Sequence, residues 1–180
     1  EDGVNFIDSR VKIDLISAEG IKSDAIDSDS SELKINNIFC LNVKNDCLDL
    51  SYSDGFIDKL KAINIKDKAV SAGERSNLKV NFLEVKNSEM GLVAKDSSFV
   101  DINIYENTLV NLPIVAFIKK RELGSPAIQV KKMNEESIKK SLISSDSNVY
   151  ISGKLLQGYL DSDNISEMLY GNQYGVKTKR

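Results

Sequence analysis

The chain repeats itself with a period of about 22 residues, from about residue 3 to about residue 120. A small residue or a proline recurs at this spacing, and an apolar residue follows it in every copy. The first set is Gly3, Ala25, Cys47, Ala69, Gly91 and Pro113, and the second is Val4, Ile26, Leu48, Val70, Leu92 and Ile114. Two further columns are Ile16, Ile38, Leu60, Phe82 and Ile104, and Ile21, Val43, Ile65, Asn87 and Leu109. A fixed period of this length predicts a solenoid.

The residues inside each repeat indicate which kind of solenoid forms. A leucine-rich repeat needs regularly placed Leu and Asn, and a helical repeat needs apolar residues spaced by three and four. The chain instead has short alternating segments, such as residues 78–82, separated by the Asn, Asp, Ser and Gly clusters that are typical of turns. We therefore expect an all-β, right-handed parallel β-helix of about six coils, with a partial C-terminal coil and a small helical cap. Equivalent positions would stack ~4.8 Å apart.

Alternation along each strand assigns side chains to the inside or the outside of the coils. The Val4 column points inward, and so does the column two residues on, which is Phe6, Ser28, Leu50, Ala72, Ala94 and Ala116. The column between them points outward and consists of Asn5, Asp27, Asp49, Ser71, Val93 and Val115. This outer column changes from acidic to apolar along the axis.

The repeat also sets the expected boundaries, with regular coils over 3–130, an irregular final coil over 131–156, and a cap and tail over 157–180. Coil four has one extra residue within 71–77, and the loop over 119–126 is about six residues longer than its equivalents. After this loop we expect strands at 127–130 and 147–151.

The end of the chain carries two helix-start signals. Short helices should begin at Asn134 and Asn164 and cover the last coil. Residues 171–180 are expected to be disordered or to lead to a further region.

Composition limits the partners. A net charge of −3 with mixed signs does not favour nucleic acid or an anionic membrane as a partner. No apolar stretch approaches the ~20 residues that a membrane span needs, and residues 1–3 open directly on a repeat without a signal peptide. Because an uncovered first coil exposes apolar core and a strand edge, we expect the chain to be a fragment of a larger protein.

Four segments together resemble a known family. They are Asn-Asp-Cys-Leu-Asp-Leu at 45–50, Asp-Lys-Ala-Val-Ser-Ala-Gly-Glu-Arg-Ser at 67–76, Gly-Leu-Val-Ala-Lys-Asp at 91–96, and Lys-Lys at 119–120 before a Gly-containing loop. They are similar to right-handed β-helix segments of bacterial secreted and surface proteins, some of which accompany domains similar to the spore-coat-protein-H kinase-like group.

The wider relatives in this resemblance are the pectin-lyase-like β-helices, which include polysaccharide lyases, hydrolases and epimerases. The resemblance covers about residues 3–130. It implies a β-helix fold and a secreted or cell-surface location in a bacterium, with a polysaccharide or another surface protein as the partner.

The residue inventory excludes several chemistries. The chain has no His and no Trp, so imidazole bases, His metal ligands and indole platforms for sugar rings are ruled out. The two cysteines, Cys40 and Cys47, stand where other coils have Ala. We expect them to be small apolar residues in tight columns, with a disulfide as the alternative.

Asp27 and Asp49 are the candidates for metal chemistry, because they face outward one coil apart and Asp29 lies two residues along the same strand. Carboxylates ~5 Å apart repel each other unless a cation lies between them, and oxygen ligands suit Ca²⁺. The alternative is a solvated acidic stripe. The resemblance to pectate-lyase-like enzymes implies a Lys or Arg base near such carboxylates, and Lys95 and Arg75 are the candidates here.

Two function classes follow from these observations. The favoured class is a non-catalytic β-helix module of a secreted or cell-surface protein, which provides rigid reach and a surface for a polysaccharide or another surface protein. The alternative is a Ca-assisted polysaccharide lyase or epimerase, against which the small size and the lack of long loops around a cleft count. We expect no cofactor other than this candidate Ca²⁺, no nucleic-acid partner and no membrane span.

Overall fold

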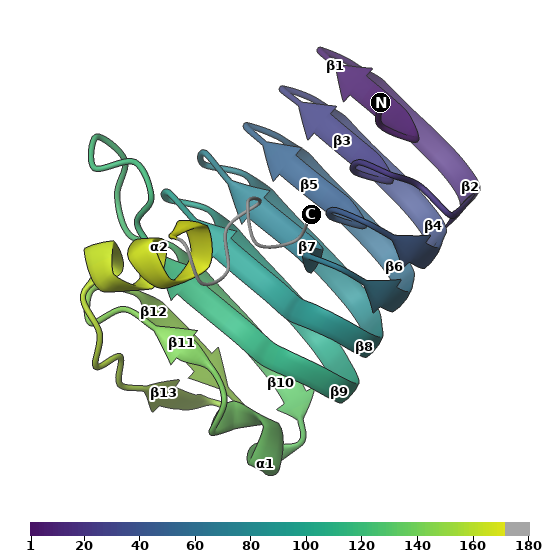
Figure 1. Cartoon of the computed structure of the whole chain (residues 1–180). Helices are drawn as coiled ribbons and strands as arrows, with labels where there is room; N and C mark the ends of the chain where they lie inside the picture. Colours follow the sequence, from purple (N-terminus) through teal and green to yellow (C-terminus); the bar gives the residue numbers. More distant parts are fainter. Residues whose placement is uncertain (172–180) are drawn as a thin grey trace.

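The computed structural model describes residues 1–171, and they form a parallel β-solenoid of about seven turns (Figure 1). The predicted parallel β-helix is therefore confirmed. Of the tail predicted to be disordered or to lead onward, residues 172–180 lie outside the described residues.

Two kinds of strand alternate along the first coils. The short strands are β1 (Val4–Ile7), β3 (Ile26–Asp29), β5 (Leu48–Ser51) and β7 (Lys68–Gly73). The long strands are β2 (Arg10–Glu19), β4 (Glu32–Val43) and β6 (Asp54–Ile65). The next two strands, β8 (Asn77–Lys95) and β9 (Phe99–Phe117), run through both kinds of position without a break. The C-terminal strands are β10 (Ala127–Met133), β11 (Leu142–Ile143), β12 (Asn148–Ile151) and β13 (Lys154–Leu156).

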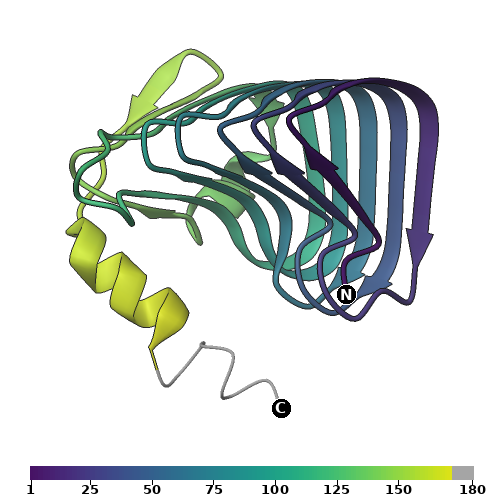
Figure 2. The same cartoon turned by 90° about the horizontal axis from the view of Figure 1, so that it is seen from above.

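Parallel pairing arranges these strands on two sides of the coil. The short-strand sheet runs β1, β3, β5, β7, then the C-terminal parts of β8 and β9, and ends with β11. The long-strand sheet runs β2, β4, β6, then the N-terminal parts of β8 and β9, followed by β10 and β12. The last strand, β13, pairs antiparallel with β12. In Figure 2 the coils lie one behind another, and the apolar core fills the space that they enclose.

The extra residue of coil four lies between Gly73 and Asn77. Ser51 pairs with Gly73 in the regular register, but Asp54 pairs with Asn77, one position further along than the repeat alone would place its partner. The regular register is restored by the time Lys68 pairs with Met90. The prediction of one inserted and recovered residue is therefore confirmed.

This insertion makes two of the predicted core columns wrong from coil four onward. Leu60 pairs with Leu83, so Leu83 and then Tyr105 occupy the buried column that we assigned to Phe82 and Ile104. Ile104 is exposed. In the same way, Ser88 and Val110 take the buried places expected for Asn87 and Leu109. The cause is that we kept the regular spacing across a segment where the true spacing is one residue longer.

Polar ladders stabilise the corners of the coil. At one corner the backbone N–H groups of Ser9, Ser31 and Ser53 each donate to a serine hydroxyl of the next coil. The acceptors are Ser31, Ser53 and Ser76, at 3.0, 3.0 and 3.1 Å. At another corner the amide groups of Asn42, Asn64 and Asn87 form a second ladder, with bonds of 2.8 and 2.7 Å. These three asparagines have positive φ, a conformation that Asn tolerates better than most residues.

Cys40 and Cys47 form a disulfide inside the core, and both are fully buried. Our expectation that they are merely small apolar residues is wrong. They do occupy the Ala columns, because Cys40 pairs with Ala18 and Ala62. The two columns meet across a corner within one coil, with the Cα atoms 5.9 Å apart, which is a normal span for a disulfide.

Two helices follow the strands. The first, α1 (Glu135–Ile138), begins after Asn134, whose side chain accepts the Glu136 N–H as predicted. The second, α2 (Ser162–Tyr170), begins after Asp161 rather than at Asn164, because the Asp161 side chain accepts the Asp163 N–H.

The position of α2 also differs from the expected cap over the last coil. Its buried residues, Ile165 and Leu169, belong to an apolar cluster with Val93, Val115 and Phe117 on the outer face of the short-strand sheet. Figure 2 shows α2 outside the stack of coils. The reason is that the outer column becomes apolar at Val93 and Val115, so this face needs a cover more than the end of the stack does.

Candidate functional site

The acidic part of the outer column lies on the short-strand sheet. Asp27 and Asp49 are register partners on β3 and β5, and the Asn5 side-chain amide donates to Asp27 at 3.1 Å. Asp29 lies in the neighbouring outward row, opposite Ser51. Partial burial, followed by the charges of Asp29 and Asp49, raises the pKa of Asp27 to about 6. The predicted pair of stacked carboxylates therefore exists, and its members repel each other.

A second aspartate ladder runs beside the first, at the corner before the short strands. The carboxylates of Asp2, Asp24 and Asp46 accept backbone N–H groups from the next coil, at 3.2, 2.8 and 2.9 Å. The ladder ends at Lys68, whose ammonium group contacts Asp46 at 3.2 Å and Asp67 at 2.8 Å. Sequence reasoning did not single out this ladder, although the recurrence of Asp at positions 2, 24 and 46 was visible as a signal.

Lys68 and Asp46 are both buried. Burial raises the pKa of Asp46. It also disfavours a charged Lys68, yet the carboxylates of Asp46 and Asp67 outweigh it and raise the pKa of Lys68. Lys68 is charged, because its ammonium group contacts two carboxylates at once and because an uncharged amine would leave the buried Asp46 carboxylate without a counter-ion.

Calcium binding by Asp27, Asp29 and Asp49 stays a prediction. Within residues 1–171, no group of three or more Asp, Glu, Cys or His side chains is placed to hold a metal ion. The stacked pair of Asp27 and Asp49 nevertheless presents oxygen atoms of the type that Ca²⁺ prefers.

The two candidate bases are not brought to this pair. Lys95 belongs to the outward row of Asp29, Ser51 and Gly73, three strands from Asp29 and hence ~14 Å along the axis. Its side chain is buried, with 6% exposed. Arg75 lies in the exposed turn after β7 with a φ of 61°, so it is not on the strand face. A catalytic role for Lys95 or Arg75 thus stays an untested hypothesis.

Lys95 instead lies in a network of charged groups at the place where β7, β8 and β9 end. The Glu74 carboxylate accepts from the Ser51 hydroxyl and the Lys120 ammonium group, both at 2.8 Å. Burial alone would raise the pKa of Glu74, but these two bonds, together with the charges of Lys95 and Lys120, lower it below its usual value. Asp96 is fully buried, and one of its oxygens accepts the backbone N–H groups of Lys119 and Lys120, both at 2.7 Å.

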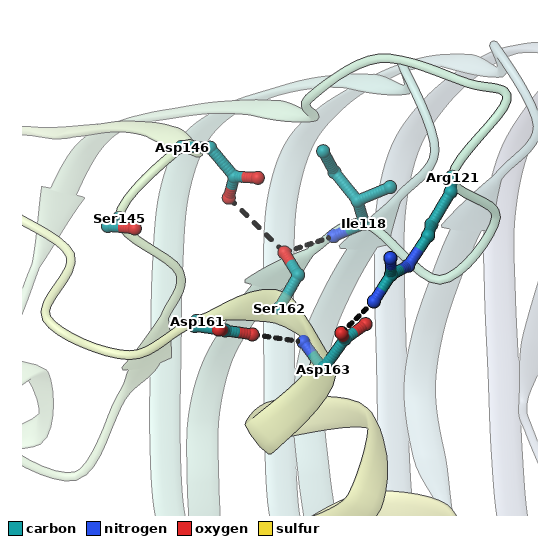
Figure 3. A pocket seen from close by; sticks show the side chains of 7 residues that line it. All are labelled: Ile118, Arg121, Ser145, Asp146, Asp161, Ser162 and Asp163. Carbon is teal, nitrogen blue, oxygen red and sulfur yellow. Dashed lines mark hydrogen bonds and ion pairs between the residues drawn. The ribbon is translucent and has the colours of Figure 1, made fainter.

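A hollow of about 330 Å³ lies where the long loop after β9 meets α2 (Figure 3). Ser162 accepts the Ile118 N–H at 2.9 Å and donates to Asp146 at 3.2 Å. Arg121 forms an ion pair with Asp163. An enlarged loop on a rigid solenoid is either a usual place for function or a tolerated insertion. The contacts show that it holds α2 in position.

A longer groove of about 550 Å³ runs along the solenoid axis on the outer face of the long-strand sheet. One wall is Arg10, Glu32, Asp54 and Asn77, the other is Lys12, Lys34, Phe56 and Lys79, and Val11, Leu33 and Gly55 lie between them. Sequence reasoning missed this groove, although residues two apart on successive coils necessarily form two parallel outward rows.

The charges of this groove are distributed unevenly between its walls. Arg10 and Glu32 form an ion pair at 2.7 Å. In the part of the chain that the structure describes, Lys12, Lys34 and Lys79 form no ion pair. The second wall therefore presents three uncompensated ammonium groups around one aromatic ring, on four successive coils.

Comparison with known proteins finds no protein-family model, no curated protein and no solved structure that matches the chain. Among residues 1–171, no helix is long and apolar enough to cross a membrane.

Proposed function

We propose that the chain is a non-catalytic β-solenoid module of a secreted or cell-surface bacterial protein, and that it binds an extended glycan along the axial groove. The groove itself carries this proposal. It is straight, it crosses four coils, and its walls combine the Phe56 ring with cationic, acidic and amide side chains. Sugar polymers offer apolar ring faces to an aromatic side chain and hydroxyls to polar ones.

The rigidity of the coils supports a role as a module. Backbone pairing continues from β1 to β12, and the Ser and Asn ladders add side-chain bonds between coils. A groove built on such strands keeps its geometry in the absence of ligand, so binding costs little ordering entropy.

The buried disulfide supports the proposed location. Disulfides persist in oxidising compartments and are rare in the cytosol, and Cys40 and Cys47 are paired inside the core. Membership of the pectin-lyase-like superfamily is part of the same proposal. Its support is the parallel stacking of coils of about 22 residues.

Glycan arrays and calorimetry with soluble oligosaccharides test the groove. Phe56→Ala should weaken binding about tenfold through the lost ring contact, and Lys34→Ala should weaken binding of acidic glycans. Lys132→Ala, exposed on β10 outside the groove, is the matched control and should bind as the wild type does. Binding that is indifferent to Phe56 and Lys34 would overturn the groove proposal. Retention of a protein instead of any glycan would identify the module as a protein-binding one.

The stacked carboxylates of Asp27 and Asp49 favour one alternative, a Ca-assisted polysaccharide lyase or epimerase. Bound Ca²⁺ should raise the melting temperature with occupancy, so a melting series in CaCl₂ against EDTA tests it, with Asp27→Asn/Asp49→Asn as the control. A lyase also releases unsaturated sugars from polyuronates, and these absorb ultraviolet light. If the melting temperature and the absorbance are both unchanged, the alternative is excluded.

A further inference from the structure

The Lys95 side chain is buried, with 6% exposed, yet its ammonium group has no carboxylate within ion-pair distance among residues 1–171. The charge of Lys95 also acts on the nearby carboxylate of Glu74, but both oxygens of that carboxylate are bonded to other groups, the Ser51 hydroxyl and the Lys120 ammonium group. A buried ammonium group without a counter-ion is costly. Such a group therefore points to a partner that is not part of the described chain.

The Lys95 ammonium group lies against Gly73 of the neighbouring strand. A Cβ atom at position 73 would lie 3.4 Å from Lys95 Cε and 3.8 Å from Lys95 Nζ, which are ordinary contact distances. The two residues face each other on adjacent strands, β7 and β8, in the same outward row. The row thus places the unpaired cation on the outer face of the short-strand sheet.

Lys119 supplies a second cation at the same place. Its ammonium group lies over the Tyr170 ring of α2, 4.7 Å from the ring centre. Lys95 pairs with Phe117 on β9, two residues before Lys119, and the neighbouring Asp96 accepts the Lys119 N–H at 2.7 Å. Desolvation, followed by the charge of Lys95, lowers the pKa of Lys119. Asp96 fixes the backbone here through the N–H groups of Lys119 and Lys120.

We propose that Lys95 and Lys119 together bind an oxyanion, either free or as a substituent of a larger molecule. A phosphate, sulfate or carboxylate group would neutralise both ammonium groups and accept hydrogen bonds from them. This site lies on the short-strand sheet beside α2 and is independent of the axial groove.

Other charges around the site set its strength. The positive charge of Lys68 lowers the pKa of Lys119, whereas the negative charges of Glu74 and Asp96 raise it. Lys68 and Glu74 are each held in an ion pair of their own. The oxyanion therefore interacts mainly with the two unpaired lysines. The remaining charges lower the affinity of the site without preventing binding.

The test measures binding of sodium phosphate and sodium sulfate to the full chain, by calorimetry and by the shift in melting temperature against sodium chloride of equal ionic strength. We expect phosphate and sulfate to stabilise the wild type beyond chloride. Lys95→Met should weaken binding at least about thirtyfold, because it removes a buried charge partner. Lys119→Met should weaken it less, and Lys132→Met, exposed on β10 and outside both this site and the axial groove, should leave it unchanged.

Two further arms keep the outcome clear. If Lys95→Met does not fold, Lys119→Met, which removes the other ammonium group, should still reduce binding by itself. Glucose 6-phosphate and glucuronate compare the sugar-borne group with the free anion. The proposal is overturned if phosphate and sulfate act on the wild type as chloride does, or if Lys95→Met and Lys119→Met both bind like the wild type.

Discussion

Leu83 and Phe82 are neighbours in the chain but have opposite environments on β8. Leu83 is fully buried in the solenoid core, whereas Phe82 is only partly buried and lies 5.4 Å from the Lys59 ammonium group outside it. We predict that Leu83→Ala lowers the free energy of unfolding by ~2–5 kcal/mol, through lost burial and a cavity, and that Leu60→Ala does the same.

Phe82→Ala is the matched control for this prediction and should cost clearly less. Urea unfolding of the three variants gives the comparison, provided that the slopes against denaturant agree. A larger loss for Phe82→Ala than for Leu83→Ala would contradict the register described above.

The raised pKa of Asp27 predicts a specific pH dependence. An Asp carboxyl group titrates near ~3.9 in an unfolded chain, and that of Asp27 titrates at about 6 in the fold. The folded state therefore binds the proton more tightly, and stability falls as the pH rises through this window. Lowering the pH from 7 to 5 should raise the melting temperature of the wild type more than that of Asp27→Asn, and Asp27→Asn should melt higher than the wild type at pH 7. Equal pH profiles for the two proteins would refute this.

At the scale of single residues, the sequence predicts the outward and inward faces where the spacing is regular, but it misses contacts that depend on neighbouring columns. Asp27 and Asp49 lie side by side because they occupy the same column of the repeat, and regular spacing makes such residues register partners. The disulfide depends on Cys40 and Cys47 meeting across a corner, and the ion pairs of Lys68 depend on the exact path of that corner. Periodicity contains no information about corner geometry, so neither contact follows from it.

At the scale of elements, the disulfide closes the corner between β4 and β5. Cys40→Ala/Cys47→Ala keeps the residue type that other coils use at both places. Loss of a cross-link across seven residues should cost about 2 kcal/mol in unfolding free energy on the chain-entropy model. Denaturant unfolding with and without a reductant gives the measurement. Reduction should destabilise the wild type and leave the double variant unchanged; an effect on both would point to another cause.

Docking of α2 gives a second prediction for an element. Ile165 and Leu169 are buried against the cluster of Val93 and Val115, so Leu169→Ala should release the helix and expose apolar sheet. Limited proteolysis between β13 and α2 should become faster, and a dye for apolar surface should bind more strongly. Met168→Ala, at a position that is 40% exposed, is the control and should behave as the wild type does. Unchanged proteolysis in Leu169→Ala would show that the helix is held by Arg121 and Ser162 instead.

The outer column explains why the sequence identifies this helix without placing it. Its capping signals and apolar spacing are local, and they predict a helix near residues 164–171 to within a few residues. Where a helix packs depends on which apolar face remains uncovered. The change from Asp49 to Val93 in the outer column was visible in the sequence, but we did not connect it with the position of the helix.

At the scale of the whole molecule, the period of the sequence was sufficient to predict the architecture, because each coil contacts only its neighbours. The same argument predicts how the chain responds to truncation. A chain ending at Val130 lacks β11, β12 and α2, so it exposes the edge of β10 together with Val93 and Val115. It should aggregate or lose solubility. Light scattering and gel filtration test this against a chain ending at Gly171, and equal behaviour of the two would remove the case for a C-terminal cover.

The extra residue between Gly73 and Asn77 is cancelled before Met90, within a single turn of the chain. A local insertion in one coil therefore leaves the register of the following coils unchanged. The length of the solenoid along its axis changes only when a whole coil is added or removed. Each added coil would move everything that follows forward by ~4.8 Å, so the reach of a protein built this way changes in steps of one coil.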